Sequence, residues 1–367
     1  MSPRESVTHV ITTIEIGGAE NQLLILSRAQ VSLGLEVHVI YLKGAPTLEE
    51  KFRESDIEVH HFAANKSLLI QLFALRRYVK YFNGVIHAHL PQAEIVAKFS
   101  RPKNFVVTRH FGGPFFPRRP GLLSKILSRI VTSRNTKVIA ISQAVRDYLF
   151  QSREIRSDKE IHVIYYGFDS ETFKLKSNLI PVENEVREFI QDSFVVGIVA
   201  RLSPEKDFPT FLKAFQILAE EVLEAKALVL GVGPSSVELK NMSKDLGLET
   251  RIFWAGKKAN ISSYMDLMDV LLLTSKFEGF GMVLLEGMSS GLPIIATNVS
   301  AIPEVIGNGG PGILVPAGDY KEFASALVKL ASSSEKRKEL GNLGRNWVKK
   351  FSVNKMIKKV NSVYESK

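Results

Sequence analysis

Short runs rich in β-branched residues alternate with amphipathic stretches along the first half of the chain. The runs predicted to form strands are followed by stretches in which apolar residues recur at helical spacing. Strands are predicted over 8–13, 36–41, 85–89, 105–108 and 137–141, and helices over 21–32, 68–82 and 121–132. Strands that alternate with helices in this way are typical of a parallel sheet covered by helices.

The same alternation begins again after a polar, irregular stretch over 167–186. Strands are predicted over 193–200, 227–231, 251–254, 270–274, 293–297 and 312–315, with a helix over 209–220 after the first of them. The two sets predict an α/β chain with two Rossmann-like domains, 1–178 and 179–351, facing each other across a cleft. Ligands are expected beyond the carboxyl ends of the strands.

Length and composition agree with two globular domains. The chain has 367 residues, of which 45% are hydrophobic and 23% charged, enough for two domains of about 150–200 residues. The absence of cysteine excludes disulfides, thiolate nucleophiles and cysteine-ligated metals. No signal sequence and no stretch of about 18 uncharged apolar residues is found. We therefore expect a cytoplasmic protein with at most peripheral contact with the inner face of the membrane.

The net charge of +10 is concentrated in the first half of the chain. Up to Asn178 there are 25 Lys and Arg against 16 Asp and Glu, whereas the remainder has 23 against 22. The block 61–137 contains 14 basic residues and a single acid, Glu94. Such a block favours an anionic partner. No nucleic-acid-binding motif accompanies it, so we expect no nucleic acid partner.

The most specific motif is the segment KFEGFGMVLLE over 276–286, with Gly-Leu-Pro at 291–293. It follows a predicted strand, and a helix is expected to begin about 280–282. Glycine lets the backbone approach a ligand, and a helix N-terminus offers unpaired N–H groups to phosphate. Glu278 precedes this helix and Glu286 lies roughly two turns inside it. Since a carboxylate accepts two hydrogen bonds from a vicinal diol, the spacing suits one acid on a sugar and one on a ribose.

A second motif, GIVARLSPEKD over 197–207, joins a predicted strand to the helix that begins near Pro209. A nucleoside diphosphate leaving group carries concentrated negative charge, which fixed cations stabilise. Arginine binds phosphate bidentately and lysine acts as a point charge. Arg201 and Lys206 are therefore candidate diphosphate ligands, although the same pair in isolation would be interpreted as solvated surface.

Weaker features lie in the first half of the chain. Gly17-Gly18 opens a helix but lacks the Gly-x-Gly-x-x-Gly spacing of a dinucleotide site. His110 ends a strand, which places it at the ligand-binding edge of the sheet. His87 and His89 share one face of a strand, but no further ligand follows at metal-binding spacing. No Asp-x-Asp motif is present to hold a cation against a diphosphate, so we expect no metal and no cofactor.

Together these motifs resemble glycosyltransferase family 4, whose members have the GT-B fold and transfer sugars with retention of anomeric configuration. The resemblance covers nearly the whole chain and is strongest in 197–206 and 278–293. It is weaker in Gly-Gly-Ala-Glu at 17–20, His-Ala-His at 87–89, Thr-Arg-His at 108–110 and Ala-Ile-Ser at 140–142. Tyr166-Gly167 departs from the Asn-Gly that is common in the family at this point.

The resemblance implies a role for each matching residue. Arg201 and Lys206 would bind the diphosphate, Glu278 the transferred sugar and Glu286 the ribose. His110 would contact the donor sugar, and Gly17-Gly18 would let diphosphate and acceptor approach the backbone. The remaining residues of the implied donor site are Gly279, Phe280, Gly281, Met282 and Val283.

The resemblance also implies how the reaction proceeds. The implied catalytic residues are His110, Arg201, Lys206 and Glu278. The family needs no metal and is usually described as using a same-face displacement in which the leaving phosphate helps to deprotonate the acceptor. A C-terminal helix over about 352–367 is expected to pack back onto the N-terminal domain.

Two basic amphipathic helices are expected in the acceptor-side half, over 68–82 and 121–131, and Arg118-Arg119 precedes the second. Its apolar positions are Leu122, Leu123, Ile126, Leu127, Ile130 and Val131, with Lys125 and Arg129 on another face. Basic amphipathic helices lie on anionic membranes. The alternative is that these apolar stripes face the core. The scarcity of acids in this block favours an anionic membrane surface.

The favoured function is therefore a retaining, metal-independent hexosyltransferase that uses a nucleotide-diphosphate sugar. Its expected acceptor is a lipid-linked or glycan hydroxyl, in cell-surface polysaccharide or glycolipid synthesis. The alternatives are a transferase for a soluble small molecule, a nucleotide-sugar epimerase of the same fold, and a non-catalytic sugar-nucleotide-binding module. The motifs at 197–207 and 276–286 favour transfer over the last two.

Overall fold

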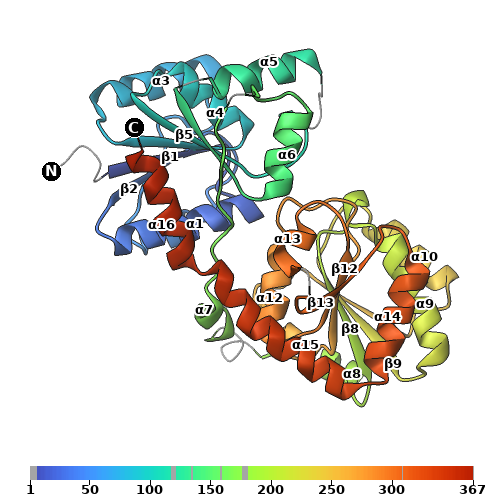
Figure 1. The fold of residues 1–367 in the computed structure, drawn as a ribbon. Coiled ribbons are helices and arrows are strands. Elements are labelled where there is room, and N and C mark those ends of the chain that lie inside the picture. The colour runs from blue at the N-terminus through green and yellow to red at the C-terminus, as the bar shows by residue number, and fades with distance from the viewer. Residues whose placement is uncertain are drawn as a thin grey trace. The chain divides into compact units, whose positions relative to one another are not determined.

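The computed structural model describes residues 6–116, 121–133, 135–157, 159–175, 181–307 and 309–366. The chain divides into two compact units (Figure 1). The N-terminal domain comprises Met1–Gly167 and Phe351–Lys367, and the C-terminal domain comprises Phe168–Lys350. Each contains one parallel sheet and its own hydrophobic core.

The sheet of the N-terminal domain has the strand order β3-β2-β1-β4-β5-β6-β7, and all its pairs are parallel. Its strands are β1 (Ser6–Ile11), β2 (Glu36–Tyr41), β3 (Glu58–His60), β4 (Val85–His89), β5 (Asn104–Arg109), β6 (Thr136–Ala140) and β7 (His162–Val163). The two edge strands, β3 and β7, are absent from the sequence prediction because they are too short to show an alternating pattern. The strand order reverses between β1 and β4, which is where ligands bind in open α/β sheets.

Helices cover both faces of this sheet (Figure 1). They are α1 (Gly18–Ser32), α2 (Glu49–Arg53), α3 (Leu68–Tyr81), α4 (Pro91–Phe99), α5 (Leu122–Val131), α6 (Gln143–Gln151) and the C-terminal α16 (Val353–Glu365). Helix α16 packs on α1, and α3, α4 and α5 pack in succession on the opposite face. Met356, Ile357 and Val360 of α16 are buried in the core with Ile11 and Val39. The last helix of the chain is therefore part of the N-terminal domain.

The sheet of the C-terminal domain has the order β10-β9-β8-β11-β12-β13 and is also parallel. Its strands are β8 (Phe194–Val199), β9 (Ala225–Leu230), β10 (Ile252–Gly256), β11 (Val270–Leu273), β12 (Ile294–Thr297) and β13 (Gly312–Val315). Phe208, Phe211, Phe215 and Phe323 are fully buried in its core. The order reverses between β8 and β11, so the predicted motifs follow the two strands of the switch point.

The helices of this domain are α7 (Ser170–Leu175), α8 (Asn184–Ile190), α9 (Phe208–Glu221), α10 (Ser236–Asp245), α11 (Ile261–Met265), α12 (Met282–Ser290), α13 (Ile302–Ile306), α14 (Tyr320–Ala331) and α15 (Ser334–Trp347), with 3-10 turns η2 (Pro204–Lys206) and η3 (Val348–Phe351). Helix α7 packs against α12 and so belongs to the C-terminal domain. The domain division therefore lies at Gly167–Phe168, earlier than the expected 178–179. Residue 178 itself is outside the described residues.

None of the helices in the described part of the chain combines the length and apolar character needed to cross a membrane.

Candidate active site

The loop after β8 and the turn after β11 are held together at the switch point of the C-terminal domain. The Thr274 hydroxyl donates to the Lys206 carbonyl at 2.9 Å. The backbone N–H of Lys276 donates to the Glu205 carbonyl, also at 2.9 Å. These bonds join the two segments that the sequence predicted to bind diphosphate and sugar, which lie far apart along the chain.

Lys206 and Glu278 form an ion pair between these two segments. Their side chains are only 20% and 12% exposed, so solvent screens the pair less than a surface pair. The Ser275 hydroxyl donates a further hydrogen bond to the same Glu278 oxygen at 2.9 Å. The ammonium and the carboxylate are therefore positioned before any ligand binds.

Arg201 lies in the same loop as Lys206 but is held differently. Its side chain is exposed, and within the described residues its guanidinium makes no hydrogen bond or ion pair. The backbone after η2 turns sharply, because Asp207 adopts a left-handed conformation with φ of 49°. The Asp207 carboxylate accepts from Thr210 at 2.8 Å and pairs with Lys276 at 3.3 Å. The loop is thus fixed while the Arg201 guanidinium remains available to an anion.

The glycine-rich turn leads directly into α12. Gly281 precedes the helix with φ of 85°, a conformation that side-chain-bearing residues rarely adopt. A Cβ at this position would also lie 3.0 Å from the Leu284 side chain. Phe280 is buried and anchors the turn. Met282 and Val283 form the first turn of the helix, where backbone N–H groups have no partner within the helix.

Glu286 lies one turn further along α12. Its side chain is partly exposed, and in the part of the chain that the structure describes no hydrogen bond or ion pair engages its carboxyl group. Desolvation raises its pKa from 4.5 to about 7. A desolvated carboxyl group without a protein partner is suited to a ligand that supplies hydrogen-bond donors.

Gly231 and Gly233 contribute to this site but are absent from the sequence prediction. Gly231 follows β9 with φ of 142°, and a Cβ there would lie 1.8 Å from the Ala200 carbonyl oxygen. A Cβ at Gly233 would lie 2.1 Å from the Leu202 carbonyl oxygen. Only glycine allows this loop to lie directly on the backbone that carries Arg201. The Gly-x-Gly at the end of the strand predicted over 227–231 is the sequence feature that could have identified these two glycines.

In the N-terminal domain, Gly17-Gly18 joins β1 to α1 as predicted. Gly17 is extended, with φ of −153°, and precedes the helix. A Cβ at Gly17 would lie 2.3 Å from the Glu20 carboxylate, whereas a Cβ at Gly18 would meet open space. The Thr13 hydroxyl donates to Glu20 at 2.7 Å. The turn is therefore held by its own neighbours and leaves the Gly18 backbone uncovered on its Cβ side.

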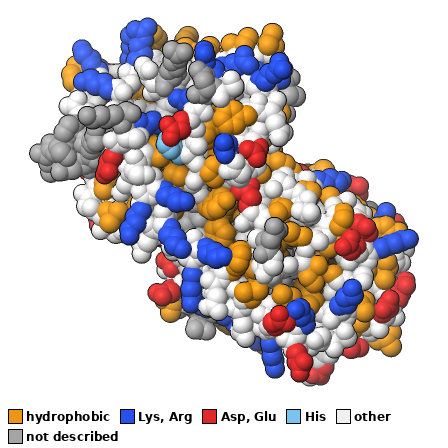
Figure 2. Space-filling model, viewed as in Figure 1, with side chains coloured by type: hydrophobic (Ala, Val, Ile, Leu, Met, Phe, Trp, Pro, Cys, Tyr) orange, Lys and Arg blue, Asp and Glu red, His pale blue; other side chains and the backbone are white. Residues whose placement is uncertain are grey.

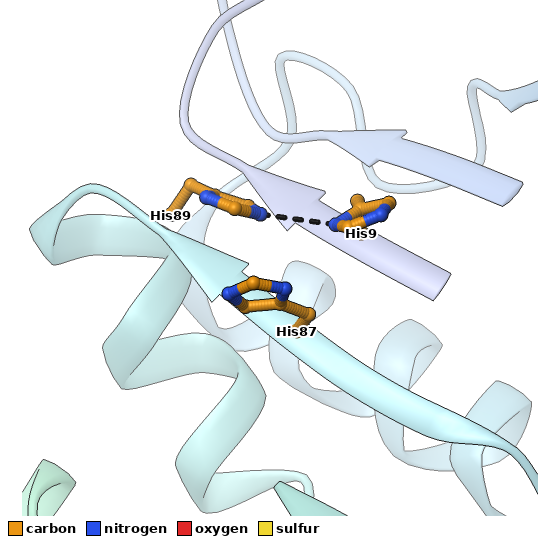
Figure 3. A group of neighbouring side chains, drawn as sticks. All are labelled: His9, His87 and His89. Atoms are coloured by element: carbon orange, nitrogen blue, oxygen red, sulfur yellow. Dashed lines mark hydrogen bonds between the residues drawn. The ribbon is translucent and has the colours of Figure 1, made fainter. Parts of the chain in front are cut away.

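His110 ends a row of buried polar side chains in the same domain. Its Nε2 lies 3.0 Å from His89 Nδ1, and His89 Nε2 lies 3.0 Å from His9 Nδ1 (Figure 3). His9 Nε2 lies 2.7 Å from Gln30 Oε1. On its other side, His110 Nδ1 lies 2.5 Å from the Tyr166 hydroxyl. Both ring nitrogens of His110 are thus hydrogen-bonded to neighbouring side chains. His110 can therefore form a hydrogen bond to a sugar only if the bond to His89 or the bond to Tyr166 breaks.

The row continues from Gln30 to the C-terminal helix. The Gln30 amide donates to the Tyr364 hydroxyl at 3.1 Å. That hydroxyl lies 2.7 Å from His87 Nδ1, and His87 Nε2 lies 2.7 Å from Thr108 Oγ1. Each hydrogen bond in the row needs one N–H or O–H donor, and each neutral side chain in the row supplies one. The row is therefore complete with every histidine neutral.

Burial agrees with this proton count. Desolvation lowers the pKa of His110 to about 3 and that of His9 to about 4. The same cause holds the pKa of His87 and of His89 well below the ordinary value. His9 brings a third imidazole to the pair that the sequence suggested, but all three rings are engaged in hydrogen bonds.

Two family models match consecutive parts of the chain. Residues 16–172 match the model described as Glycosyltransferase Family 4, and residues 181–347 match Glycosyl transferases group 1. The chain belongs to glycosyltransferase family 4. It is a glycosyltransferase with the GT-B fold, which confirms the expected family, fold class and type of enzyme.

Relatives of this glycosyltransferase act on different acceptors. N-acetyl-alpha-D-glucosaminyl L-malate synthase of Bacillus anthracis is 29% identical over 211 residues, covering 57% of this chain and 55% of that protein. The UDP-Gal:alpha-D-GlcNAc-diphosphoundecaprenol alpha-1,3-galactosyltransferase of Escherichia coli is 26% identical over 305 residues, covering 81% of this chain and 78% of that protein. Both are glycosyltransferases by name, but their names indicate a small molecule for one and a lipid-linked sugar for the other.

A solved structure agrees over nearly the whole length. Anabaena HepE, crystallised with UDP-glucose, superimposes with a TM-score of 0.83 at 21% identity, covering 97% of this chain and 98% of that chain. At this identity the likeness supports the fold alone.

Proposed function

We propose that this glycosyltransferase is a retaining, metal-independent hexosyltransferase that uses a nucleotide-diphosphate sugar. The observation that carries the proposal is the arrangement of Arg201, Lys206, Glu278 and Glu286 at the switch point of the C-terminal domain. Two cations, an acid that is paired with one of them and a carboxyl group that has no partner among the described residues lie there on three adjacent segments. This is the set of groups that a nucleoside diphosphate sugar requires.

The Lys206–Glu278 pair holds both groups ready for the donor. When a diphosphate enters, the Lys206 ammonium turns to the phosphate and the Glu278 carboxylate becomes free to accept hydrogen bonds from the sugar. Arg201 binds the same diphosphate through its exposed guanidinium. As the bond between sugar and phosphate breaks, negative charge grows on the leaving group, and these fixed cations stabilise it. The residues perform this task without a metal ion.

Glu286 is proposed to bind the ribose. Its carboxylate accepts hydrogen bonds from both hydroxyls of a vicinal diol. The first turn of α12, at Met282 and Val283, lies beside the phosphates, where the helix dipole favours negative charge. In the N-terminal domain, His110 and Gly17-Gly18 are proposed to approach the donor sugar and the acceptor.

Donor binding tests the proposal directly. Purified protein is mixed with uridine, guanosine and adenosine diphosphates and their sugars, and the midpoint of thermal unfolding is measured. One nucleotide series should raise the midpoint, and Glu286→Ala should remove most of that shift. Glu335→Ala, an exposed acid of α15, serves as the matched control. Absence of any shift in the whole panel would contradict the proposed donor class.

The acceptor is proposed to be lipid-linked or a glycan at a membrane surface, because α5 is turned outward. Leu122 and Leu123 are 75% and 69% exposed. The buried side of the helix carries Ser124 and Ser128 instead. Ser128 accepts from Arg109 at 3.0 Å, and Ser124 accepts from the Phe116 backbone at 3.1 Å. The apolar stripe of α5 therefore faces outward over most of its length, and only its last residue, Val131, is buried in the core.

The beginning of α3 shows the same arrangement. Leu69 and Phe73 are 67% and 68% exposed, whereas Gln71 is buried and donates to the Leu42 carbonyl at 2.7 Å. Exposed basic residues accompany the two helices: Arg76, Arg77, Lys80, Lys125 and Arg129. Figure 2 shows hydrophobic and basic side chains together along the margin of the domain that carries α3 and α5. Arg118 and Arg119 lie outside the described residues.

The single acid of the basic block does not offset this charge at the surface. Glu94 is 1% exposed and pairs with Arg109 at 3.0 Å. The described surface of the block 61–137 is therefore basic and carries no carboxylate. An outward apolar stripe flanked by cations fits an anionic bilayer. We place the enzyme at the cytoplasmic face of the membrane on this basis.

A further inference from the structure

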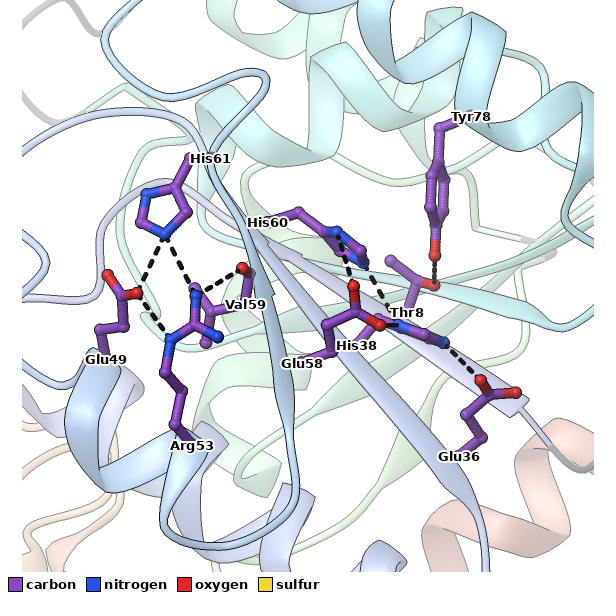
Figure 4. A network of polar contacts seen from close by, with 10 residues as sticks. All are labelled: Thr8, Glu36, His38, Glu49, Arg53, Glu58, Val59, His60, His61 and Tyr78. Atoms are coloured by element: carbon purple, nitrogen blue, oxygen red, sulfur yellow. Dashed lines mark hydrogen bonds and ion pairs between the residues drawn. The ribbon is translucent and has the colours of Figure 1, made fainter.

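A second group of histidines lies on the face of the N-terminal sheet that α3 covers, apart from the switch point. His38 on β2 and Glu58 and His60 on β3 project from one face of two neighbouring strands (Figure 4). Glu36, the first residue of β2, lies beside them. The group therefore lies on the outermost strand of the sheet, β3, and on the strand next to it, β2.

The contacts within this group meet at one nitrogen. His38 Nδ1 lies 3.2 Å from His60 Nε2 and 3.3 Å from Glu58 Oε2. The other nitrogen of each ring also faces a carboxylate: His38 Nε2 lies 3.4 Å from Glu36, and His60 Nδ1 lies 3.5 Å from the second Glu58 oxygen. The ring nitrogens thus form an inner set that faces Glu58 Oε2 and an outer set that faces carboxylate oxygens.

Among these contacts only the one between His38 Nδ1 and His60 Nε2 is a hydrogen bond. The contacts to Glu36 and Glu58 are ion-pair distances. His38 Nδ1, His60 Nε2 and Glu58 Oε2 lie within 4.8 Å of one another, so a cation between them would replace a single hydrogen bond. The row through His9 and His89 is instead joined by hydrogen bonds in succession and is buried, whereas the group on β2 and β3 brings a carboxylate that is exposed to solvent.

We propose that His38 Nδ1, His60 Nε2 and Glu58 Oε2 bind a divalent cation of the zinc class. Four-coordinate zinc with ligands at 2.0–2.1 Å places neighbouring ligand atoms about 3.3 Å apart, which matches the two inner distances. Metal-bound imidazoles donate their second N–H to a carboxylate, and the Glu36 carboxylate, 3.4 Å from His38 Nε2, is placed to take this role for His38. Two imidazoles and one carboxylate suit zinc and leave a position for water.

The neighbouring residues hold this group in place without competing for it. The His38 ring meets the edge of Phe82 at 6.2 Å, and the His60 ring meets Tyr78 at 5.5 Å. Arg53, which Figure 4 also shows, donates to Glu49 at 2.8 Å and to the Val59 carbonyl at 3.2 Å. Glu58 is 60% exposed on the open side, which gives a cation access from solvent. A bound cation would fasten the three-residue strand β3 to β2.

The experiment is a zinc titration that does not depend on transferase activity. Protein stripped with EDTA and desalted is titrated with zinc chloride by calorimetry, and the thermal midpoint is recorded with and without zinc. We expect one zinc per chain and a raised midpoint. Cobalt(II) in the same site should give the visible absorption of a four-coordinate ion.

The variants identify the site. Glu58→Gln, at an exposed position that should not disturb folding, should weaken zinc binding at least tenfold, and the double variant His38→Gln/His60→Gln should abolish it. Glu36→Gln should weaken binding about tenfold, as loss of an outer-shell carboxylate does. His61→Gln is the control, because His61 contacts Glu49 outside the inner set. Zinc binding that survives in Glu58→Gln, or that is absent from the parent protein, would refute the site. Donor binding at the switch point is unaffected by either outcome.

Discussion

Lys206 and Glu278 are paired across 72 positions of the sequence and join the two loops of the switch point. Neither side chain is more than 20% exposed. Removing either partner would leave the other charge unpaired in a desolvated position, which is energetically costly. Its position at the carboxyl ends of β8 and β11 indicates that the pair holds two ligand-binding groups in readiness for the donor.

The first prediction follows from that pair. Lys206→Ala and Arg201→Ala should each lower kcat more than they raise the donor KM, because charge on the diphosphate grows as the sugar departs. A lost charged hydrogen bond costs about 1.5–3 kcal/mol, so each change should reduce turnover at least tenfold. Steady-state kinetics with the identified donor measure this. Lys213→Ala on α9 is the control, and equal kinetics in all three variants would contradict the assignment.

The second prediction concerns the pH dependence of donor binding. The pKa of Glu286 is raised to about 7 by desolvation, and its carboxylate form accepts more hydrogen bonds from a ribose than its acid form. Donor affinity should therefore fall several-fold as the pH drops from 8 to 6. Calorimetry with an intact nucleotide sugar measures the trend. In Glu286→Gln the affinity should be lower and independent of pH, whereas an unchanged pH profile would exclude ribose binding by this group.

The same pKa shift has a consequence for stability without ligand. Because the folded pKa of Glu286 lies above its ordinary value of 4.5, the folded state retains the proton longer than the unfolded state. The contribution of this group to stability is therefore fully present below pH 4.5 and is lost as the pH rises to about 7. Glu286→Gln should flatten this part of the stability profile. Denaturant unfolding at pH 5 and pH 7.5 tests the sign, and a parent protein that gains more stability than the variant over this range would contradict it.

The fold could be predicted from the sequence where elements are long enough to show a period. Continuous apolar runs gave the inner strands β8 and β11, since strands buried on both faces need no polar alternation, and runs rich in β-branched residues gave β1, β2 and β4. The edge strands β3 and β7 have three and two residues, too few for any pattern. Periodicity located the apolar stripe of α5 but did not show whether the stripe is buried or exposed, because the sequence pattern is the same in both cases. The buried Ser124 and Ser128 decide that direction only in three dimensions.

The candidate site was predictable only within each loop. The motifs identified Arg201, Lys206, Glu278 and Glu286 individually, because glycine turns after strands have a clear physical use. The pairing of Lys206 with Glu278 depends on β8 and β11 being neighbours, which strand order determines. His9 and His89 are 80 positions apart and meet through the parallel register of β1 and β4. No local pattern contains that information.

The third prediction separates catalysis from metal binding. The transferase is proposed to need no cation, whereas the group on β2 and β3 is proposed to bind zinc. EDTA should therefore leave turnover unchanged at 25 °C and lower the midpoint of thermal unfolding, and added zinc should restore only the midpoint. Activity that falls with EDTA and returns with magnesium would contradict metal-independent transfer. Glu58→Gln, treated identically, should show no EDTA effect on the midpoint.

The fourth prediction tests the membrane surface through α5. Replacing exposed apolar residues with serine, as Leu122→Ser/Leu123→Ser/Ile126→Ser, should leave the thermal midpoint unchanged because these side chains contribute little to the core. Flotation with vesicles rich in anionic lipid should fall at least tenfold, since burying each such side chain contributes about 1.5–3 kcal/mol. Binding of the parent protein should also weaken as salt rises, because cations beside the stripe attract anionic headgroups.

Leu223→Ser/Val237→Ser is the matched control, since Leu223 and Val237 are 71% and 74% exposed in the other domain. If the α5 variant and this control float equally well, α5 does not bind the membrane, and a soluble acceptor such as that of the malate-modifying relative becomes the favoured substrate.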